Sequence, residues 1–89
     1  MKRNKAKSLN VAAAGILQAV DAAGKLGAPG GALYAGLMAA GYTLAEFEQV
    51  MAALAGPAGL VLKRGQLYTL TDKGVVMNAR ITEALRKAA

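Results

Sequence analysis

Residues 41–46 read Gly-Tyr-Thr-Leu-Ala-Glu and hold the strongest local signal in this 89-residue sequence. Thr43 and Glu46 form a capping box, in which the Thr43 hydroxyl can accept from the Glu46 N–H and the Glu46 carboxylate can accept from the Thr43 N–H. The box predicts a helix that begins after Thr43 and runs to about Ala55. Its expected apolar stripe consists of Phe47, Val50, Met51 and Leu54.

A second predicted helix ends just before this box. Gly41 is suited to the left-handed conformation that terminates helices, so this helix is expected to end near Ala40. Pro29 is suited to its first position, because proline lacks the N–H that would be unpaired there. Its buried face is expected to carry Leu33, Tyr34 and Leu37. Only Tyr42 separates Gly41 from the cap, so the two helices are expected to form a helix-turn-helix.

An earlier helix is expected to begin at Ser8 or Asn10, either of which can cap it, and to run to about Ala23. Its apolar residues recur at three- and four-residue spacing: Leu9, Ala13, Ile16, Val20 and Ala23. Alanine supplies 21 of the 89 residues. Because alanine favours helix and has little volume, the sequence predicts a largely helical domain with close helix contacts.

The hydrophobic period changes from helical to extended after residues 56–59. Two β-prone runs, residues 60–63 and 66–70, flank Arg64-Gly65, so we expect a hairpin with that pair as its link. The expected cross-strand pairs are Leu62 with Leu67 and Val61 with Tyr68. Both faces of the hairpin are then partly apolar, and the pattern leaves open which of them is buried.

A final helix is expected to begin at Asp72, with Thr71 as its cap and the Asp72 carboxylate near the positive end of the helix dipole. One side of this helix carries Met77, Ile81, Ala84, Leu85 and Ala88. The candidate dimer interface is formed by Met77, Ile81, Leu85 and Ala88. Packing of the same stripe on the protein's own first helix is the alternative. The other side carries Lys73, Arg80, Glu83 and Lys87, with Glu83 and Lys87 in the order that favours an ion pair.

The composition excludes several classes of function. The chain has no cysteine, no histidine and five acidic residues. These counts leave no disulfide or thiolate metal site and remove most acid-base and metal-ligand chemistry, so we expect no enzyme, no cofactor and no metal. The lack of cysteine fits a reducing, cytoplasmic location. Pro29 and five glycines interrupt the uncharged run of residues 26–45, so no membrane span is expected.

The net charge of +6 is concentrated at the N-terminus. The first seven residues carry +4, and the remaining chain carries +2. The cations of this basic segment are Lys2, Arg3, Lys5 and Lys7. We therefore divide the chain into a basic flexible tail, residues 1–7, and one folded domain, residues 8–89. Such a tail can contact phosphates or anionic lipid, and the alternative is a solvated terminus.

Residues 33–74, about half of the chain, carry a wider pattern. The capped helix is followed by Ala58-Gly59-Leu60-Val61, by the turn Lys63-Arg64-Gly65-Gln66, and by Leu67-Tyr68-Thr69-Leu70-Thr71-Asp72-Lys73-Gly74. Here the sequence resembles the winged helix-turn-helix superfamily, particularly small bacterial transcription regulators. The resemblance implies a mainly α fold with a small β-hairpin (α+β), in the order α-α-α-β-β-α. It also implies that the third helix reads DNA and that the hairpin, or wing, lies near phosphates or the minor groove.

The third helix departs from the pattern of that superfamily on its outward face. This face carries Ala45, Glu46, Glu48, Gln49, Ala52 and Ala53. It offers two carboxylates and no Lys or Arg, whereas phosphate contact depends on Lys and Arg and base reading on Arg, Lys, Asn and Gln. Gln49 is therefore the candidate base contact, and Lys63 and Arg64 of the wing, together with the basic tail, are the main candidates for phosphate contact.

Two functions remain open from the sequence. The first is binding of DNA or RNA by a transcription-regulator-like protein, mainly through the wing and the tail. The second is a protein-interaction or dimerisation module on the same scaffold, with little DNA binding. In that module the alanine-rich, acidic third helix would dock a basic partner, or the last helix would pair with a second copy.

Overall fold

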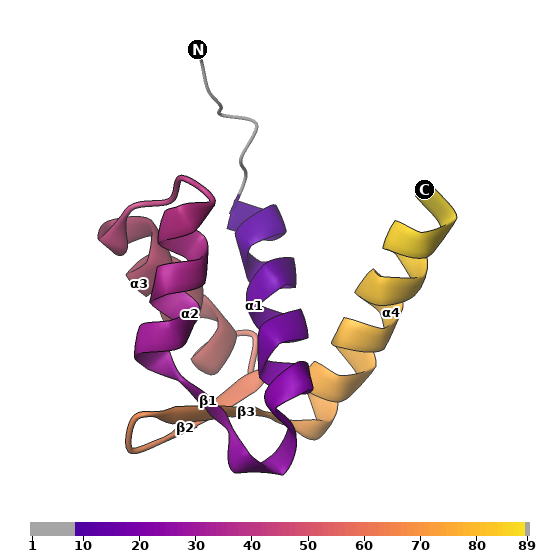
Figure 1. Cartoon of the computed structure of the whole chain (residues 1–89). Coiled ribbons are helices and arrows are strands. Elements are labelled where there is room, and N and C mark those ends of the chain that lie inside the picture. Colours follow the sequence, from indigo (N-terminus) through magenta and orange to yellow (C-terminus); the bar gives the residue numbers. More distant parts are fainter. Residues whose placement is uncertain (1–8, 89) are drawn as a thin grey trace.

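The computed structural model describes residues 9–88, most of which lie in helices or in a small sheet (Figure 1). The elements are α1 (Leu9–Ala23), a 3-10 turn η1 (Gly24–Leu26), β1 (Ala28–Pro29), α2 (Gly30–Ala39), α3 (Leu44–Ala55), β2 (Val61–Arg64), β3 (Leu67–Leu70) and α4 (Asp72–Ala88). The sheet is antiparallel, with the strand order β1-β3-β2. The fold is therefore mainly α with a small antiparallel sheet, which confirms the predicted α+β class.

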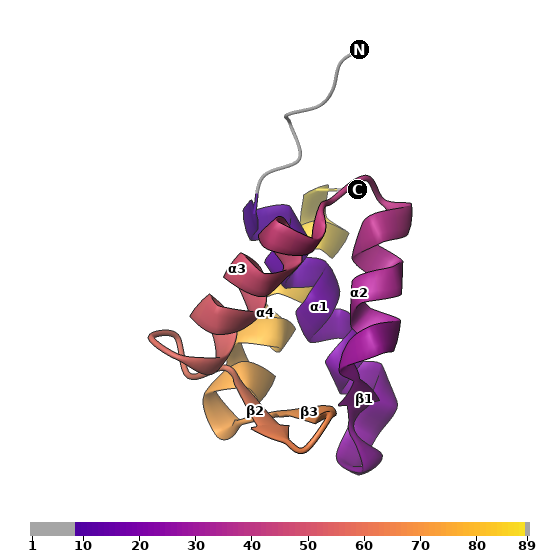
Figure 2. The same ribbon diagram turned by 90° about the vertical axis from the view of Figure 1, so that its left-hand side faces the viewer.

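Helices α1, α2 and α3 stand together on one side of the sheet, which crosses their lower ends (Figure 1, Figure 2). Helix α1 contacts α2, α3, α4 and β3, so it is the centre of the packing. The largest fully buried side chains are Ile16, Leu17 and Val20 of α1 and Val61 of β2. Helix α4 begins beside α1 at the sheet and leans away from it toward the C-terminus (Figure 1).

The predicted capping box is present at the start of α3. The Thr43 N–H donates to Glu46 Oε1 at 2.8 Å, and the Glu46 N–H donates to Thr43 Oγ1 at 3.1 Å. The Phe47 ring is half-buried and lies 5.4 Å from the Tyr34 ring of α2, centroid to centroid. The rest of the predicted stripe is buried: Val50, Met51 and Leu54. The box and the stripe together fix where α3 begins and which side of it faces the core.

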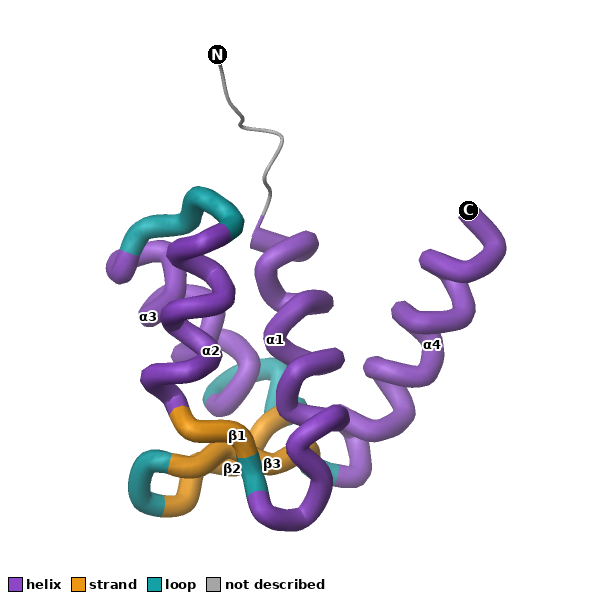
Figure 3. The backbone as a smooth tube through the Cα atoms, in the orientation of Figure 1, coloured by secondary structure: helices purple, strands orange, loops and turns teal. Residues whose placement is uncertain are grey.

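The end of α2 is a Schellman motif at the predicted glycine. The Gly41 N–H donates to the Met38 carbonyl, and the Tyr42 N–H donates to the Leu37 carbonyl, both at 3.0 Å. Gly41 has a φ of 100°, a conformation that a residue with a Cβ atom resists. The helix therefore stops abruptly, and only the short loop of residues 40–43 connects α2 with α3 (Figure 3).

The hairpin forms, but its link lies one residue later than the sequence predicted. Arg64 pairs with Leu67, so the link is Gly65-Gln66 rather than Arg64-Gly65. The favoured two-residue turns need a positive φ at their first central residue, which arginine resists and Gly65 adopts at 61°. The predicted pairs of Leu62 with Leu67 and Val61 with Tyr68 are therefore wrong, and the observed pairs are Leu62 with Thr69 and Val61 with Leu70.

The structure also decides which face of the hairpin is buried. Val61 and Tyr68 are buried, whereas Leu62 and Leu67 are 46% and 41% exposed on the opposite face. The register error amounts to two positions along the partner strand. Because side chains alternate with a period of two, that error leaves Leu62 on the same face as Leu67, and Val61 on the same face as Tyr68, as the predicted pairs had them.

Strand β1 was not predicted. Ala28 pairs with Tyr68 and Pro29 with Leu67, and the Gly30 N–H donates to the Gln66 carbonyl at 3.0 Å. These bonds hold Pro29 extended, with ψ at 138°, immediately before α2. The prediction that Pro29 occupies the first helical position is therefore wrong. Proline is tolerated in β1 because this strand lies at the sheet edge, where a missing donor breaks no central ladder.

The start of α4 is bonded to the loop that precedes β2. Thr71 Oγ1 accepts from the Gly74 N–H at 3.0 Å, which confirms the predicted cap, and donates to the Gly59 carbonyl at 2.6 Å. The Thr71 N–H donates to the Leu60 carbonyl at 3.0 Å. A Cβ atom at Gly74 would lie 1.9 Å from the same Leu60 oxygen. The helix and the loop therefore meet with no room for a side chain between them.

Candidate functional site

Lys63 and Arg64, the two cations of the hairpin, lie at the end of β2, and both side chains are exposed. Successive strand residues point to opposite faces, so Lys63 lies on the face of Tyr68 and Arg64 on the outer face. The Lys63 Nζ is 6.0 Å from the centroid of the Tyr68 ring. The two charges therefore flank the hairpin, one on each side of it.

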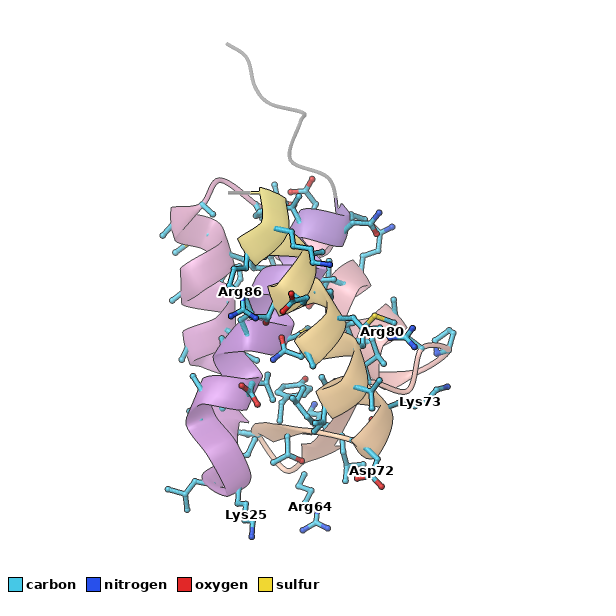
Figure 4. The ribbon with its side chains drawn as sticks, turned by 90° about the vertical axis from the view of Figure 1, so that its right-hand side faces the viewer. Lys25, Arg64, Asp72, Lys73, Arg80 and Arg86 are labelled. Carbon is cyan, nitrogen blue, oxygen red and sulfur yellow. The ribbon has the colours of Figure 1, made fainter. Side chains whose placement is uncertain are left out.

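Arg64 lies near a cation that the sequence analysis did not select. Lys25 of η1 lines the same hollow as Arg64, about 550 Å³ in volume, to which Asp21 adds one carboxylate. Figure 4 shows the Lys25 and Arg64 side chains directed away from the body at the sheet end of the molecule. No sequence spacing connects these residues, because the pairing of β1 with β3 is what brings η1 to the hairpin.

The outward face of α3 has no cation, as predicted. Glu48 and Gln49 are exposed, and Glu46 is half-buried where it closes the capping box. Gln49 lines a groove between α1, α3 and α4, whereas Arg64 lines the hollow at the sheet. The structure therefore does not bring the candidate base contact and the wing cation into one hollow. The remaining predicted contacts lie outside the described residues: Lys2, Arg3, Lys5 and Lys7.

Helix α4 carries a row of exposed cations that the resemblance did not point to. Lys73, Arg80 and Lys87 recur every seven residues, which places them along one flank of the helix. Lys73 and Arg80 line a hollow of about 400 Å³ together with one carboxylate (Figure 4). Glu83 forms its ion pair with Arg86 instead of the predicted Lys87. The sequence analysis placed these three cations on one side of the helix but did not select them as candidate phosphate contacts.

An apolar groove of about 810 Å³ opens between α1, α3 and α4. Sixteen residues line it, none of them is charged, and its polar members are the amides of Asn10, Gln18 and Gln49. Three of the four predicted dimer residues line this groove: Met77, Ile81 and Leu85. Ile81 is half-buried against the core, whereas Met77 and Leu85 are 37% and 53% exposed. The side chain of Ala88 lies outside the described part of the structure.

Within residues 9–88, no group of three or more His, Cys, Asp or Glu side chains could hold a metal ion. No helix of that range combines the length and the apolar character needed to cross a bilayer. In the same range, one buried side-chain atom lacks a hydrogen-bond partner, the Oδ1 of Asn78 on α4. This side chain is 7% exposed and so belongs to the packed part of the helix.

No protein-family model matches this sequence, and comparison with curated proteins and with solved structures gave no match. The molecule is thus defined by its own features, a mainly α fold with a small antiparallel sheet, exposed cations at a hairpin and along a helix, and one uncharged groove.

Proposed function

We propose that the chain is a winged helix-turn-helix protein that binds nucleic acid, mainly through its wing and its basic N-terminal residues. The order of elements supports this assignment, since α2 and α3 meet across a glycine turn and the β2–β3 hairpin follows α3. In helix-turn-helix proteins the second helix of the motif approaches the major groove. A hairpin that follows that helix can then reach the neighbouring phosphates.

The observation that carries the proposal is the pair of exposed cations at the hairpin. Lys63 and Arg64 lie on opposite faces of β2, and neither has an ion-pair partner among the described residues. A cation that is not neutralised within the protein can replace a condensed counterion at a phosphate, and this exchange drives non-specific binding. The +4 charge of the first seven residues adds to the same effect.

We expect binding with little sequence preference. Sequence is read by side chains that hydrogen-bond to base edges, chiefly Arg, Lys, Asn and Gln. The exposed face of α3 offers Gln49 for this purpose, and the carboxylate of Glu48 beside it opposes approach to phosphates. Most of the affinity is therefore expected to come from phosphate contacts, which makes it strongly dependent on salt.

The test is fluorescence anisotropy with random-sequence duplex DNA between about 50 mM and about 200 mM salt. The unmodified chain is compared with a wing variant, Lys63→Ser with Arg64→Ser, and with a tail variant in which four cations become serine: Lys2, Arg3, Lys5 and Lys7. Each lost phosphate contact lowers the slope of log K against log salt by about 0.9. The wing variant is therefore expected to lose about 1.8 of slope if both cations contact phosphates.

A matched control removes the same charge elsewhere. The variant Arg80→Ser with Lys87→Ser also loses two exposed cations, but from α4. Its slope is expected to change less than that of the wing variant. If the unmodified chain does not bind DNA at the lower salt concentration, the nucleic-acid proposal fails. Equal losses in the wing and control variants would show that total charge, and not the wing, determines binding.

A second candidate function is a protein-interaction module on the same scaffold. It is favoured by the uncharged groove between α1, α3 and α4, since no cation lines it and nucleic acid gains nothing there. The salt titration separates the two functions, because a module of this kind leaves duplex DNA unbound at every salt concentration.

A further inference from the structure

Beyond Ile81, the apolar side of α4 is not covered by the other residues that the structure describes, 9–88. Near the start of the helix, Gly74 and Asn78 are buried, and Ile81 is half-buried. Leu85, one turn further on, is 53% exposed, although it belongs to the same stripe. Figure 1 gives the reason, because α4 diverges from α1 toward the C-terminus and leaves the groove between them open.

We propose that this groove is the surface at which two copies of the chain associate, each placing the apolar side of its α4 in the groove of the other. The proposal goes beyond nucleic-acid binding and does not rest on it. The groove and the apolar side of α4 adjoin each other on one molecule. A twofold axis can therefore bring each of these surfaces to its counterpart, as a symmetric dimer interface requires.

The charge distribution favours a second copy as the occupant. The chain carries +6 overall, so two copies repel each other across most relative orientations. The sixteen residues that line the groove contain no Lys, Arg, Asp or Glu. None of the charged residues of α4 lines the groove: Asp72, Lys73, Arg80, Glu83, Arg86 and Lys87. The groove is thus a face on which self-association involves no burial of charge.

Other occupants fit the same surface less well. A phosphate or a fatty-acid carboxylate is bound most strongly by Lys or Arg, and neither residue type lines the groove. The chain's own residues 1–8 contain four cations and two further polar residues, so they match an apolar groove poorly. An amphipathic helix with an uncharged side matches it well, and α4 is such a helix.

A stable dimer interface has to extend beyond the groove itself. A standard interface buries about 800 Å² on each partner and involves about 20–30 residues a side. The described molecule exposes 5636 Å², so such an interface takes about one seventh of its surface. The sixteen lining residues are fewer than that number, so exposed residues of α4 beside the groove have to contribute to the interface as well. A domain of this length has a thin core, so the added burial also stabilises its fold.

The interface has a consequence for the basic N-terminal segment. Leu9, Asn10 and Val11, the first residues of α1, line the groove. Association therefore brings the points where residues 1–8 join the two folds to the edges of a single interface. A dimer carries +12 in place of +6, so its attraction to any polyanion is greater than that of a monomer.

The experiment is sedimentation velocity of the full chain, without nucleic acid, from about 1 μM to about 1 mM. We expect the 9.0 kDa chain to shift from monomer to dimer across this range. Leu85→Glu is compared with Val76→Glu. Val76 lies on the same helix and is 55% exposed, against 53% for Leu85, but it does not line the groove. Leu85→Glu is expected to raise the dissociation constant at least about tenfold, and Val76→Glu to change it less than about threefold.

A second pair of variants tests the opposite wall of the groove. Ala53 lines the groove from α3, whereas Ala52 is exposed on the same helix and does not. Ala53→Glu is expected to weaken the dimer as Leu85→Glu does, and Ala52→Glu to leave it intact. Circular dichroism of each variant identifies any that has lost its fold. A wild-type chain that stays monomeric throughout overturns the proposal. Equal dissociation constants for the groove variants and their controls would overturn the proposal as well.

Discussion

At its beginning α4 is bonded to the loop before β2 through Thr71, whereas at its end every side chain from Thr82 to Lys87 is exposed. The two ends nevertheless belong to one regular helix with one apolar stripe. Gly74 packs against the Leu60 carbonyl so closely that a Cβ atom has no space there. Leu85 has more than half of its surface in contact with solvent.

This difference shows that an amphipathic stripe does not by itself define a core. The stripe identifies the side of a helix that can be buried, and the angle between helices decides how far along that side the burial extends. In α4 the burial ends near Ile81, and the helix diverges from α1 toward its C-terminus (Figure 1). The first half of α4 thus packs on the domain, and the apolar side of the second half remains exposed.

The largest effect is expected from Gly74→Ala. The added methyl group would lie 1.9 Å from the Leu60 carbonyl oxygen, so the loop or the helix has to move. Overpacking against backbone is expected to lower the free energy of unfolding by about 3 kcal/mol, measured by urea denaturation at low protein concentration. Gly36→Ala in α2 is the control. Its added methyl group would have no atom within 4 Å, so it is expected to raise the free energy of unfolding by about 0.5–1 kcal/mol. A Gly74→Ala protein as stable as the unmodified chain would contradict the tight junction.

A smaller loss is expected from Thr71→Ala. The change removes the acceptor for the Gly74 N–H and the donor to the Gly59 carbonyl, so two backbone groups lose their partner. Loss of a helix cap of this kind lowers stability by about 1–2 kcal/mol. Thr82→Ala, on the exposed end of the same helix, is expected to change it by less than about 0.5 kcal/mol. Similar values for the two variants would show that the two ends of α4 are held equally.

The sequence predicted the helices better than it predicted the sheet. The signals that begin and end a helix are local, because each acts on residues within one turn. They are the capping box of Thr43 and Glu46, the C-terminal glycine Gly41, and the N-cap Thr71. Strand β1 depends on a partner about forty residues away, and its two residues carry no alternating pattern. The hairpin register depended on which residue adopts a positive φ, and the prediction placed Gly65 second in the link where the turn needs it first.

The residues of the candidate site show the same difference between local signals, which the sequence reveals, and long-range contacts, which it does not. Exposure of Lys63 and Arg64 follows from their place beside a turn, and the sequence was sufficient to select them. Lys25 and Arg64 line one hollow only because β1 pairs with β3, so no spacing in the sequence places them together. The apolar stripe of α4 was predicted either to form a dimer interface or to pack on the first helix. Packing within the chain describes the first half of α4, and the dimer interface stays a prediction. Ile81 packs on the core, and Leu85 remains exposed beside an open groove.

A gain of about 1 kcal/mol is expected from Asn78→Leu. Asn78 lies where the packed half of α4 gives way to the exposed half, and its buried Oδ1 has no hydrogen-bond partner. A buried polar atom without a partner costs free energy, and a leucine, whose side chain branches at the same carbon, removes that cost. Asn10→Leu, at an exposed position of α1, serves as the control and is expected to have little effect. Thermal unfolding at low protein concentration measures both, and a loss of stability in Asn78→Leu would mean that the amide is satisfied in solution.

The smallest effect is expected from Leu85→Ala in the dilute protein. Because the side chain is 53% exposed, its truncation is expected to change the free energy of unfolding by less than about 0.5 kcal/mol, as is Leu26→Ala at a position that is 85% exposed. A loss above about 1 kcal/mol at low concentration would mean that the end of α4 packs on its own chain.

At high protein concentration the unfolding temperatures of Leu85→Ala and Leu26→Ala are expected to differ. Association stabilises a fold by mass action, so the unfolding temperature of the unmodified chain and of Leu26→Ala rises with concentration. That of Leu85→Ala rises less, because it has lost part of the surface on which the second copy is held.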